Sequence, residues 1–440
     1  MTDIAVVGAG LTGSLLACFL ARRGHTVTVY ERRADPRTTG AERGRSINLA
    51  LSERGIDALR RIGLDGRALA DALPMRGRMI HPATPPGGEL DFQSYSLDGQ
   101  RAINSISRGA LNNALLDAAD GTAGITIRFE HRLTGLDPLV FATPSGEVKV
   151  GADVVIGADG AGSAVRGQLL GLGLLAETVD FLDYGYKELT IAPAPDGDFA
   201  LDPGALHIWP RGTSMMIALP NPDRTFTCTL FWPNGGTSSF ASLGSPAAIE
   251  RHFQAVYPDV VPLMPNLVDD YRLNPVGLLG TVRCGPWHAA TPGGPVGLIG
   301  DAAHAIVPFY GQGANCGFED CVVLDRVLDE TGDDLTAALP LFEARRREDV
   351  EAIAAMALNN FVEMRDKVAS PLFRLGKTVE HALERALPGR YVSRYELVSF
   401  STTPYAQVRD RVRRQHQALA AIGVLAAGAI AAAVLKGWRR

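Results

Sequence analysis

The chain has 440 residues, of which 46% are hydrophobic and 21% are charged, and its formal net charge is −5. This length exceeds what one hydrophobic core usually serves, so we expect two domains and an appended helical segment. The slightly negative charge excludes a general attraction to nucleic acid or anionic lipid. The five cysteines show no paired or metal-binding spacing, which favours free thiols, a reducing compartment and no metal site.

The first 31 residues predict a nucleotide-binding βαβ unit. In order, they contain an apolar strand over 4–7, the run Gly-Ala-Gly-Leu-Thr-Gly over 8–13, a helix over 11–23 and a strand over 26–30. Gly8 would permit a tight turn, Gly10 would let a pyrophosphate approach, and Gly13 would let the helix pack closely on the strand. Phosphates would sit on the helix N-terminus, and Glu31 would accept hydrogen bonds from a ribose. A glycine-rich turn without a ligand is the weaker alternative. Because the N-terminus runs directly into this strand, we expect no signal peptide and a cytoplasmic location.

Cationic residues follow close to this unit. Arg32 and Arg33 would either contact the phosphates of the nucleotide or belong to a solvated loop. A helix is predicted over 52–62, and the break in helix and strand alternation over 75–95 indicates an excursion from the nucleotide-binding domain. Arg108 then begins a helical pattern, which is unfavourable for a cation unless it meets an anion; a surface arginine is the alternative.

The middle of the chain predicts an inserted sheet. Strands over 125–129 and 152–157 lead to the turn at Asp159, and short strands separated by turns over 184–232 predict an antiparallel sheet. A strand over 296–299 then runs into Asp301 and a glycine-rich loop before a helix over 317–328. That order suits the ribityl chain and pyrimidine ring of a flavin.

The tail differs from the rest of the chain. Residues 418–435 carry no charge and are flanked by basic residues on both sides. As a helix this run would reach about 27 Å, just enough for a bilayer core of about 30 Å. Because it is rich in alanine, a membrane anchor and a helix docked on the protein are equally supported.

Three groups of residues together resemble the FAD-dependent aromatic hydroxylases of the para-hydroxybenzoate hydroxylase type. They are 8–13 with Glu31, 159–160 with Ser163 and Arg166, and 300–301 with Pro308 and 311–313. Within that group, further runs are similar to the kynurenine 3-monooxygenases. These runs are 44–52, 75–81, 186–189, 307–313 with Asn315, 356–358, Asn360, 362–364 and 394–395. The resemblance covers residues 1–408.

The resemblance implies an α/β fold with a Rossmann-like FAD-binding domain of the glutathione reductase type, an inserted antiparallel-sheet substrate domain and a C-terminal helical segment. The implied segments are 1–70, 101–180 and 281–370 for the FAD-binding domain, 71–100 and 181–280 for the substrate domain, 371–416 for the helical region and 417–440 for the apolar tail.

The resemblance also implies the site residues. FAD would be bound by Gly8, Gly10, Leu11, Thr12, Gly13, Tyr30, Glu31, Arg32, Arg33, Ala50, Arg108, Asp159, Asp301, Gly313, Ala314 and Asn315. The substrate would be bound by Arg78, Tyr95, Asn360, Tyr395, Pro308, Phe309 and Tyr310. An arginine binds the carboxylate of an amino acid bidentately. From the residues alone, a surface salt bridge at Arg78 and a half-buried core tyrosine at Tyr395 are the alternatives. Tyr310 stands where relatives often carry Phe or His, and Ala314 where Met is common.

The implied activity is hydroxylation of L-kynurenine to 3-hydroxykynurenine, in tryptophan catabolism. NADPH would reduce tightly bound FAD, and O₂ would add to give a flavin C4a-hydroperoxide that transfers its distal oxygen to the ring. No catalytic acid or base is predicted, and we expect His304 to be structural. NADPH would bind transiently, since a second glycine motif after a strand is missing. The alternatives are a hydroxylase of another aromatic acid and a non-catalytic FAD-binding redox partner; a halogenase lacks its Trp-x-Trp-x-Ile-Pro signature here.

Overall fold

The structure is a computed structural model that describes the backbone of residues 1–39, 48–83, 89–367 and 370–438. Side chains are described throughout this part except at 39, 366–367, 371–375, 377–378, 381 and 422–438. Residues 44–47 of the run 44–52 therefore lie outside the described residues, as do most side chains of the apolar tail.

A six-stranded sheet forms the core of the nucleotide-binding part, in the order β18, β19, β12, β1, β2, β8. Its strands are β1 (Asp3–Val7), β2 (Thr26–Tyr30), β8 (Ile125–Arg128), β12 (Val154–Gly157), β18 (His288–Thr291) and β19 (Gly294–Leu298). β18 is antiparallel to β19, and the other pairs are parallel. Four consecutive residues of β1 and all of β12 are buried, as a parallel sheet covered on both faces requires.

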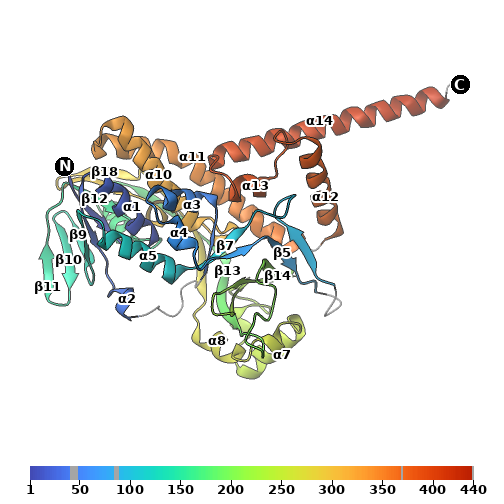
Figure 1. The fold of residues 1–440 in the computed structure, drawn as a ribbon, viewed down its shortest axis with the longest axis horizontal. Helices are drawn as coiled ribbons and strands as arrows, with labels where there is room; N and C mark the ends of the chain where they lie inside the picture. Colours follow the sequence, from blue (N-terminus) through green and yellow to red (C-terminus); the bar gives the residue numbers. More distant parts are fainter. Residues whose placement is uncertain (40–47, 84–88, 368–369, 439–440) are drawn as a thin grey trace.

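Helices from distant parts of the sequence cover this sheet (Figure 1). They are α1 (Leu11–Arg22), α3 (Glu53–Arg61), α5 (Arg108–Asp120), α10 (Gly313–Thr331) and α11 (Leu335–Val362). α1 connects β1 to β2 and packs against both α5 and α10. The βαβ unit expected from the glycine motif is therefore present, and its first helix lies beside a helix that begins 300 residues later.

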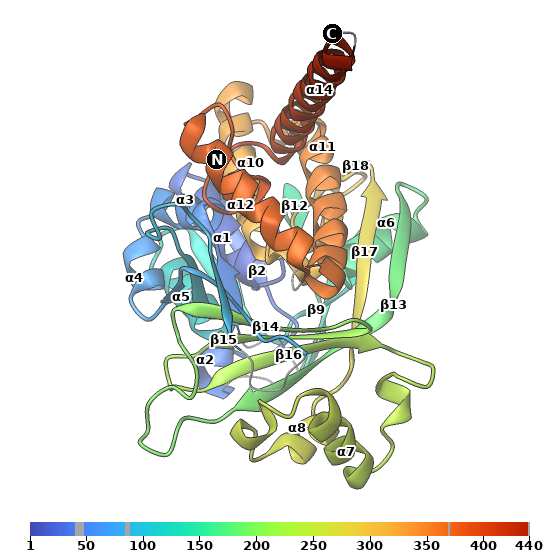
Figure 2. The same cartoon turned by 90° about the vertical axis from the view of Figure 1, so that its right-hand side faces the viewer.

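A seven-stranded sheet lies across one end of this layer, with α7 and α8 on its outer face (Figure 2). Its order is β17 (Gly277–Gly285), β13 (Ala176–Ile191), β16 (Phe226–Pro233), β15 (Ser214–Pro220), β14 (Ala205–Arg211), β5 (Gly77–Ile80), β6 (Asp91–Ser94). The helices are α7 (Pro246–Val256) and α8 (Leu267–Leu273). β5 pairs parallel with β14, so the excursion near residue 77 joins the inserted sheet. This sheet is the inserted sheet that the sequence predicts, and most of its strand pairs are antiparallel.

Smaller elements complete this part of the chain. A three-stranded sheet pairs β3 (Asn48–Leu51) and β4 (Leu73–Met75) with β7 (Ile103–Ser107), and another contains β9 (Arg132–Leu136), β10 (Leu139–Thr143) and β11 (Gly146–Lys149). The short helices are α2 (Pro36–Thr39), α4 (Asp65–Leu69), α6 (Ala164–Gly171) and α9 (Asp301–His304), with 3₁₀ turns at Phe240–Ser242, Val261–Leu263 and Pro308–Tyr310. The assignment of exact domain boundaries stays a prediction.

The C-terminal part is helical. α11 ends in a π-helical turn, Glu363–Lys367, and is followed by α12 (Pro371–Ala386), α13 (Arg394–Ser399) and α14 (Tyr405–Trp438). The far end of α14 extends away from the rest of the molecule (Figure 1). Within the described part of the chain, no helix has the length and apolar character needed to cross a membrane. The side chains of 422–435, which carry most of the expected anchor, lie outside that part.

Candidate active site

The three glycines of the first turn differ in their surroundings. Gly8 has a φ of +108°, and a Cβ there would lie 2.6 Å from the carbonyl oxygen of Ala158. A Cβ on Gly13 would lie 2.0 Å from the carbonyl oxygen of Gly8. A Cβ on Gly10 would meet no atom within 4 Å. Gly8 and Gly13 are therefore required by backbone packing, whereas Gly10 faces open space at the N-terminus of α1.

Glu31 is fixed beside this turn at the end of β2. Its carboxylate accepts one hydrogen bond from the backbone N–H of Ala9, at 3.0 Å, and another from that of Arg33, at 3.1 Å. Glu31 as a whole residue is 9% exposed, and the Arg33 guanidinium lies 3.8 Å from its carboxylate. Each carboxylate oxygen keeps a second acceptor position, so the group fits the hydroxyl groups of a ribose.

The N-terminus of α10 offers a second open helix end. Gln312 occupies the N-cap position and its side chain makes no capping bond, and a Cβ on Gly313 would meet no atom within 4 Å. The N-terminus of α1 likewise has no side-chain cap. Free N–H groups and the helix dipole at both places suit negatively charged or electron-rich groups. A phosphate at α1 and a flavin ring at α10 would meet these requirements.

Asn315 on α10 connects strand β3 to the turn that precedes α10. Its side-chain oxygen accepts a hydrogen bond from Ser52 N–H at 2.9 Å, and its Nδ2 donates to the carbonyls of Ala50 and Gly311 at 2.9 and 2.8 Å. The Asn315 side chain and the Ala50 carbonyl are thereby occupied. The predicted contacts of Asn315 and Ala50 with a cofactor would therefore have to use other atoms of these residues. A predicted contact of Ala314 would come from its backbone.

Asp301 and Arg108 carry opposite charges near the same region. Asp301 begins α9 and has solvent-accessible surface. The protein atoms around it nevertheless desolvate its carboxyl and raise the pKa of that group, while Arg108 partly opposes the rise. Arg108 begins α5 and forms no ion pair within the described residues. No carboxylate of the described residues therefore lies within ion-pair distance of this cation at the helix start, and whether it meets a ligand anion stays a prediction.

Several other predicted cofactor residues use their side chains elsewhere. Thr12 packs between Gly300 and Gly317, with its Oγ1 only 2.6 Å from where a Gly317 Cβ would be. The ring of Tyr30 stacks on Phe141 with centroids 4.2 Å apart. Leu11 is buried in the core, and Arg32 is exposed. Any contact of Leu11, Thr12 or Tyr30 with a cofactor would come from the backbone.

Asp159 caps a helix. Its carboxylate accepts hydrogen bonds from the Ser163 hydroxyl at 2.5 Å and from the backbone N–H groups of Ala164 and Val165 at 2.6 and 3.2 Å. Both oxygens therefore serve the start of α6. Arg166 binds the carbonyl of Ala302 at 2.8 Å, which ties this turn to α9.

Arg78 is a buried cation that lies among aromatic rings. It lies on β5 with 6% exposure, and its guanidinium carbon is 4.5 Å from the ring centre of Tyr395 and 5.9 Å from that of Tyr95. Its Nε and the Tyr95 hydroxyl are both buried without a hydrogen-bond partner, and no ion pair of Arg78 occurs among the described residues. The alternative of a surface salt bridge at Arg78 is therefore wrong. Burying an unpaired charge is costly, so the site fits an anionic ligand.

The other predicted substrate residues gather around this cation. Tyr395 stacks on Tyr95 with ring centres 4.7 Å apart, and on Tyr310 at 5.8 Å. Asn360 donates to the Phe309 carbonyl at 2.7 Å, and Pro308 is exposed at the edge of the same turn. Phe309 also stacks on Phe361 and contacts Phe231, at 4.0 and 5.0 Å. The structure thus brings a cation, three tyrosines and a phenylalanine wall together.

One ion pair beside this cluster has no role in the sequence-based prediction. Arg394 binds Glu363 at 2.7 Å, and both are close enough to Tyr310 to affect its pKa, which burial raises. The residues stand in runs, 362–364 and 394–395, that carry the family resemblance. Because Glu363 and Arg394 stand close to Asn360 and Tyr395 in the sequence, this proximity could have indicated that they lie near the predicted substrate residues.

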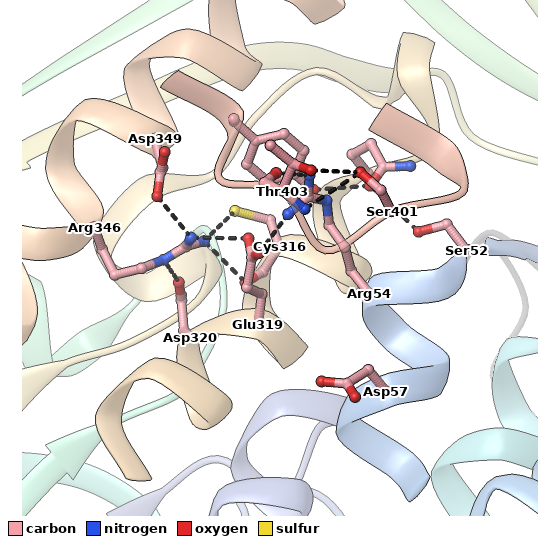
Figure 3. A network of polar contacts seen from close by, with 12 residues as sticks. Ser52, Arg54, Asp57, Cys316, Glu319, Asp320, Arg346, Asp349, Ser401 and Thr403 are labelled. Carbon is pink, nitrogen blue, oxygen red and sulfur yellow. Dashed lines mark hydrogen bonds and ion pairs between the residues drawn. The ribbon is translucent and has the colours of Figure 1, made fainter. Parts of the chain in front are cut away.

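A buried charged network was also missed. It joins three helices and consists of Arg54 on α3, Glu319 and Asp320 on α10, and Arg346 and Asp349 on α11 (Figure 3). In a sequence, a single charged residue within a helical pattern indicates a solvent-exposed position. The sequence therefore offered no signal that these charged side chains are buried.

His304 belongs to the same network. It bonds Asp320 at 2.6 Å, and although burial alone would raise the Asp320 pKa, His304 and Arg346 lower it to about 2. Its contacts support the structural role expected for His304. Cys316 lies near this pair, but Arg346 is 3.2 Å from its sulfur and 2.8 Å from Asp320, so this cation opposes metal binding there.

Comparison with known proteins agrees with these features. A family model described as an FAD binding domain matches residues 1–189 and 289–355. A kynurenine 3-monooxygenase of Myxococcus xanthus is 51% identical over 91% of this chain and 86% of its own length. One of Stenotrophomonas maltophilia is 48% identical over 95% and 92%.

Solved structures share the fold. The tetrameric form of 2-methyl-3-hydroxypyridine-5-carboxylic acid oxygenase matches with a TM-score of 0.66 and 20% identity, over 87% of this chain and 96% of that one. A probable FAD-dependent monooxygenase of Pseudomonas aeruginosa, pqsL, matches with a TM-score of 0.62 and 21% identity, over 83% and 97%. The predicted fold class is confirmed. The chain therefore belongs to the kynurenine 3-monooxygenases, a family of FAD-dependent monooxygenases.

Proposed function

We propose that the protein hydroxylates the aromatic ring of L-kynurenine at carbon 3, using FAD, NADPH and O₂. The observation that carries this proposal is the buried guanidinium of Arg78 among tyrosine rings, whose Nε has no hydrogen-bond partner in the described part of the chain. An α-amino acid with an aromatic ring has the two features that this cluster can bind, a carboxylate for the cation and a planar ring for the aromatic side chains. The names of the similar curated proteins support the same substrate.

In this proposal Arg78 binds the substrate carboxylate bidentately, and the Tyr95 hydroxyl donates a further hydrogen bond to it. Asn360 is oriented by the Phe309 carbonyl and contacts the amino acid portion of the substrate. Tyr310 and Tyr395 line the same space. Placing the carboxylate at Arg78 fixes the direction in which the aromatic ring points.

The N-terminus of α1 and Glu31 would hold the pyrophosphate and ribose of FAD, and the N-terminus of α10 would face its ring system. When bound, FAD supplies the redox chemistry, which takes a hydride from NADPH and passes one atom of O₂ to the substrate. The aniline nitrogen of kynurenine already activates the neighbouring ring carbon, so no protein base is assigned. Phe309, Phe361 and Phe231 exclude water from the substrate ring. NADPH is a transient co-substrate in this scheme.

The test is the rate of NADPH oxidation by FAD-loaded protein with and without L-kynurenine, with the product identified by mass. We expect strong stimulation and a product one oxygen atom heavier. Stimulation by another aromatic acid but not by kynurenine would move the substrate and keep the enzyme class. A protein that binds FAD but oxidises no NADPH would be a redox partner instead.

We also propose that residues 418–435 contact a membrane surface. The run is uncharged, it is flanked by Arg413 and Arg414 before it and by Lys436 after it, and the far end of α14 extends away from the body (Figure 1). Basic residues next to an apolar helix favour the interface of a bilayer.

A further inference from the structure

The first turn of the C-terminal helix contacts the loop that precedes α10. The hydroxyl of Tyr405, the first residue of α14, donates a hydrogen bond to Oε1 of Gln312 at 2.8 Å. Tyr405 has no exposed surface, and burial holds the pKa of its hydroxyl well above the ordinary value although Arg54 opposes the shift. The hydroxyl therefore stays protonated and acts as a donor across the physiological pH range.

Charged residues from three other helices fix Tyr405 in place. The Arg54 guanidinium lies 3.8 Å from the centre of the Tyr405 ring and bonds both Glu319 and the carbonyl of Thr403. The next residue of α14 donates its backbone N–H to Asp349 at 2.8 Å, and Arg346 joins Asp349 to Glu319 (Figure 3). An aromatic ring under a fully buried guanidinium has little freedom to move.

Gln312 is the residue on which this contact acts. It is 1% exposed and sits at the N-cap of α10, directly before the open position at Gly313. Its side-chain oxygen faces Tyr405 and the Ser52 hydroxyl, the latter at 3.5 Å, and makes no bond to the N–H groups of α10. Those N–H groups therefore remain available for an electron-rich ligand.

We propose that Tyr405 is a positioning residue for the flavin ring. Its hydroxyl fixes the side chain of Gln312, the N-cap residue of α10, and thereby sets the place of that helix end. The C-terminal helix would thus act on the flavin ring through Gln312. This inference rests on FAD binding by the family fold and not on the identity of the aromatic substrate.

The test is Tyr405→Phe, which keeps the ring and its contact with Arg54 and removes the hydroxyl. Losing one buried hydrogen bond at an element that contacts the ligand predicts an increase of about three- to tenfold in the Kd of FAD for the apoprotein. We also expect a shift in the visible absorption bands of bound FAD. In turnover, the fraction of NADPH consumed that appears as hydrogen peroxide should rise, while the KM for the aromatic substrate changes little.

The matched control is Tyr391→Phe, because Tyr391 lies in the same C-terminal region and its hydroxyl bonds none of the described residues. Gln312→Ala should reproduce the Tyr405→Phe effects, and the double variant should show no further change. If Tyr405→Phe does not fold, Gln312→Ala carries the test alone. An unchanged FAD Kd and spectrum in Gln312→Ala, or equal effects in Tyr391→Phe, would overturn the proposal. The FAD Kd and spectrum need no kynurenine, so a wrong substrate leaves these two readouts intact.

Discussion

Arg78 lies in a buried, aromatic environment that is unusual for an arginine. The family resemblance pointed to it as a carboxylate ligand, whereas reasoning from its neighbours in the sequence favoured a surface salt bridge. Burial excludes the surface salt bridge and leaves the carboxylate role a prediction. Arg78 is buried because β5 joins the seven-stranded sheet by pairing with β14, more than 120 residues away. A pairing over that distance leaves no local pattern in the sequence.

Replacing Arg78 with Ala tests its role directly. The variant loses a charge-assisted, bidentate contact worth about 2–4 kcal/mol, so kcat/KM for kynurenine should fall at least about 30-fold, mostly through KM. The FAD content should not change. Arg76→Ala is the matched control, since Arg76 precedes β5 by one residue and its side chain is exposed. Equal kinetics in Arg78→Ala and the wild type would remove the carboxylate assignment.

His207 makes stability depend on pH. Its Nε2 lies 2.9 Å from the carbonyl of Asp202, which can only accept, and its Nδ1 lies 2.9 Å from a nitrogen of His81. The neutral ring satisfies both contacts, and burial lowers the pKa of His207 from 6.5 to about 4. As pH falls below 6.5 the unfolded chain gains this proton first, so the folded state loses stability until about pH 4.

Between pH 7 and pH 5 this group should cost the folded state about 2 kcal/mol, since one pKa unit corresponds to about 1.4 kcal/mol. His207→Gln should reduce the acid sensitivity by about that amount, measured as the free energy of unfolding in denaturant at both pH values. His416→Gln is the control because His416 is exposed on α14. An identical pH dependence in wild type and His207→Gln would show that His207 titrates normally.

At the scale of elements, the turn between β1 and α1 separates folding from ligand binding. Gly13→Ala raises helix propensity by about 1 kcal/mol, but its Cβ would lie 2.0 Å from the Gly8 carbonyl oxygen. We therefore expect destabilisation of at least about 3 kcal/mol. Gly10 has a φ of −76° and an open Cβ position, so Gly10→Ala should leave the apoprotein as stable as the wild type.

The same Gly10→Ala variant should bind FAD at least about tenfold more weakly, because its methyl group occupies space that the pyrophosphate needs. Thermal unfolding of the apoproteins and FAD titration by fluorescence separate the two effects. A Gly13→Ala protein more stable than wild type, or a Gly10→Ala protein with full FAD affinity, would contradict this division of roles.

Local patterns predicted the elements that depend on neighbouring residues. The βαβ unit followed from the glycine spacing, and the helix predicted over 52–62 is present as Glu53–Arg61. α10 begins at Gly313 rather than near residue 317, because glycines at a helix start resemble a loop in sequence. Ser52 occupies the predicted N-cap position, but its side chain turns toward Gln312 instead of capping α3.

The parts that escaped prediction depend on contacts across the chain. Arg54 and Glu319 are 265 positions apart and are buried together, although each alone reads as a surface charge. The π-helical turn that places Glu363 beside Arg394 likewise has no signature in residue type or spacing. The family resemblance named the residues that we expect around the substrate. How these residues pack against one another became clear only from the structure.

At the scale of the whole molecule, the C-terminal helix α14 contacts parts of the chain that are far apart in the sequence. α14 begins at the buried network behind α10, and the stretch 411–415 is bonded to the loop before α13 through Gln415 and Val392. The described contacts of α14 thus involve its first turns. The later turns extend beyond the body, as Figure 1 shows. The two functions proposed for this helix therefore occupy different parts of it.

Deleting residues 418–440 distinguishes a membrane contact from a docked helix. The full chain should float with vesicles of phosphatidylcholine and phosphatidylglycerol in a density gradient, and the shortened chain should stay at the bottom. Ala427→Lys in the full chain is the matched variant, since a charge at the centre of an apolar helix costs about 3 kcal/mol on insertion. Because Tyr405 and its contacts remain, kcat/KM and FAD affinity should not change. A full chain that does not float, together with a shortened chain that unfolds at a lower temperature, would instead assign the run to packing on the protein.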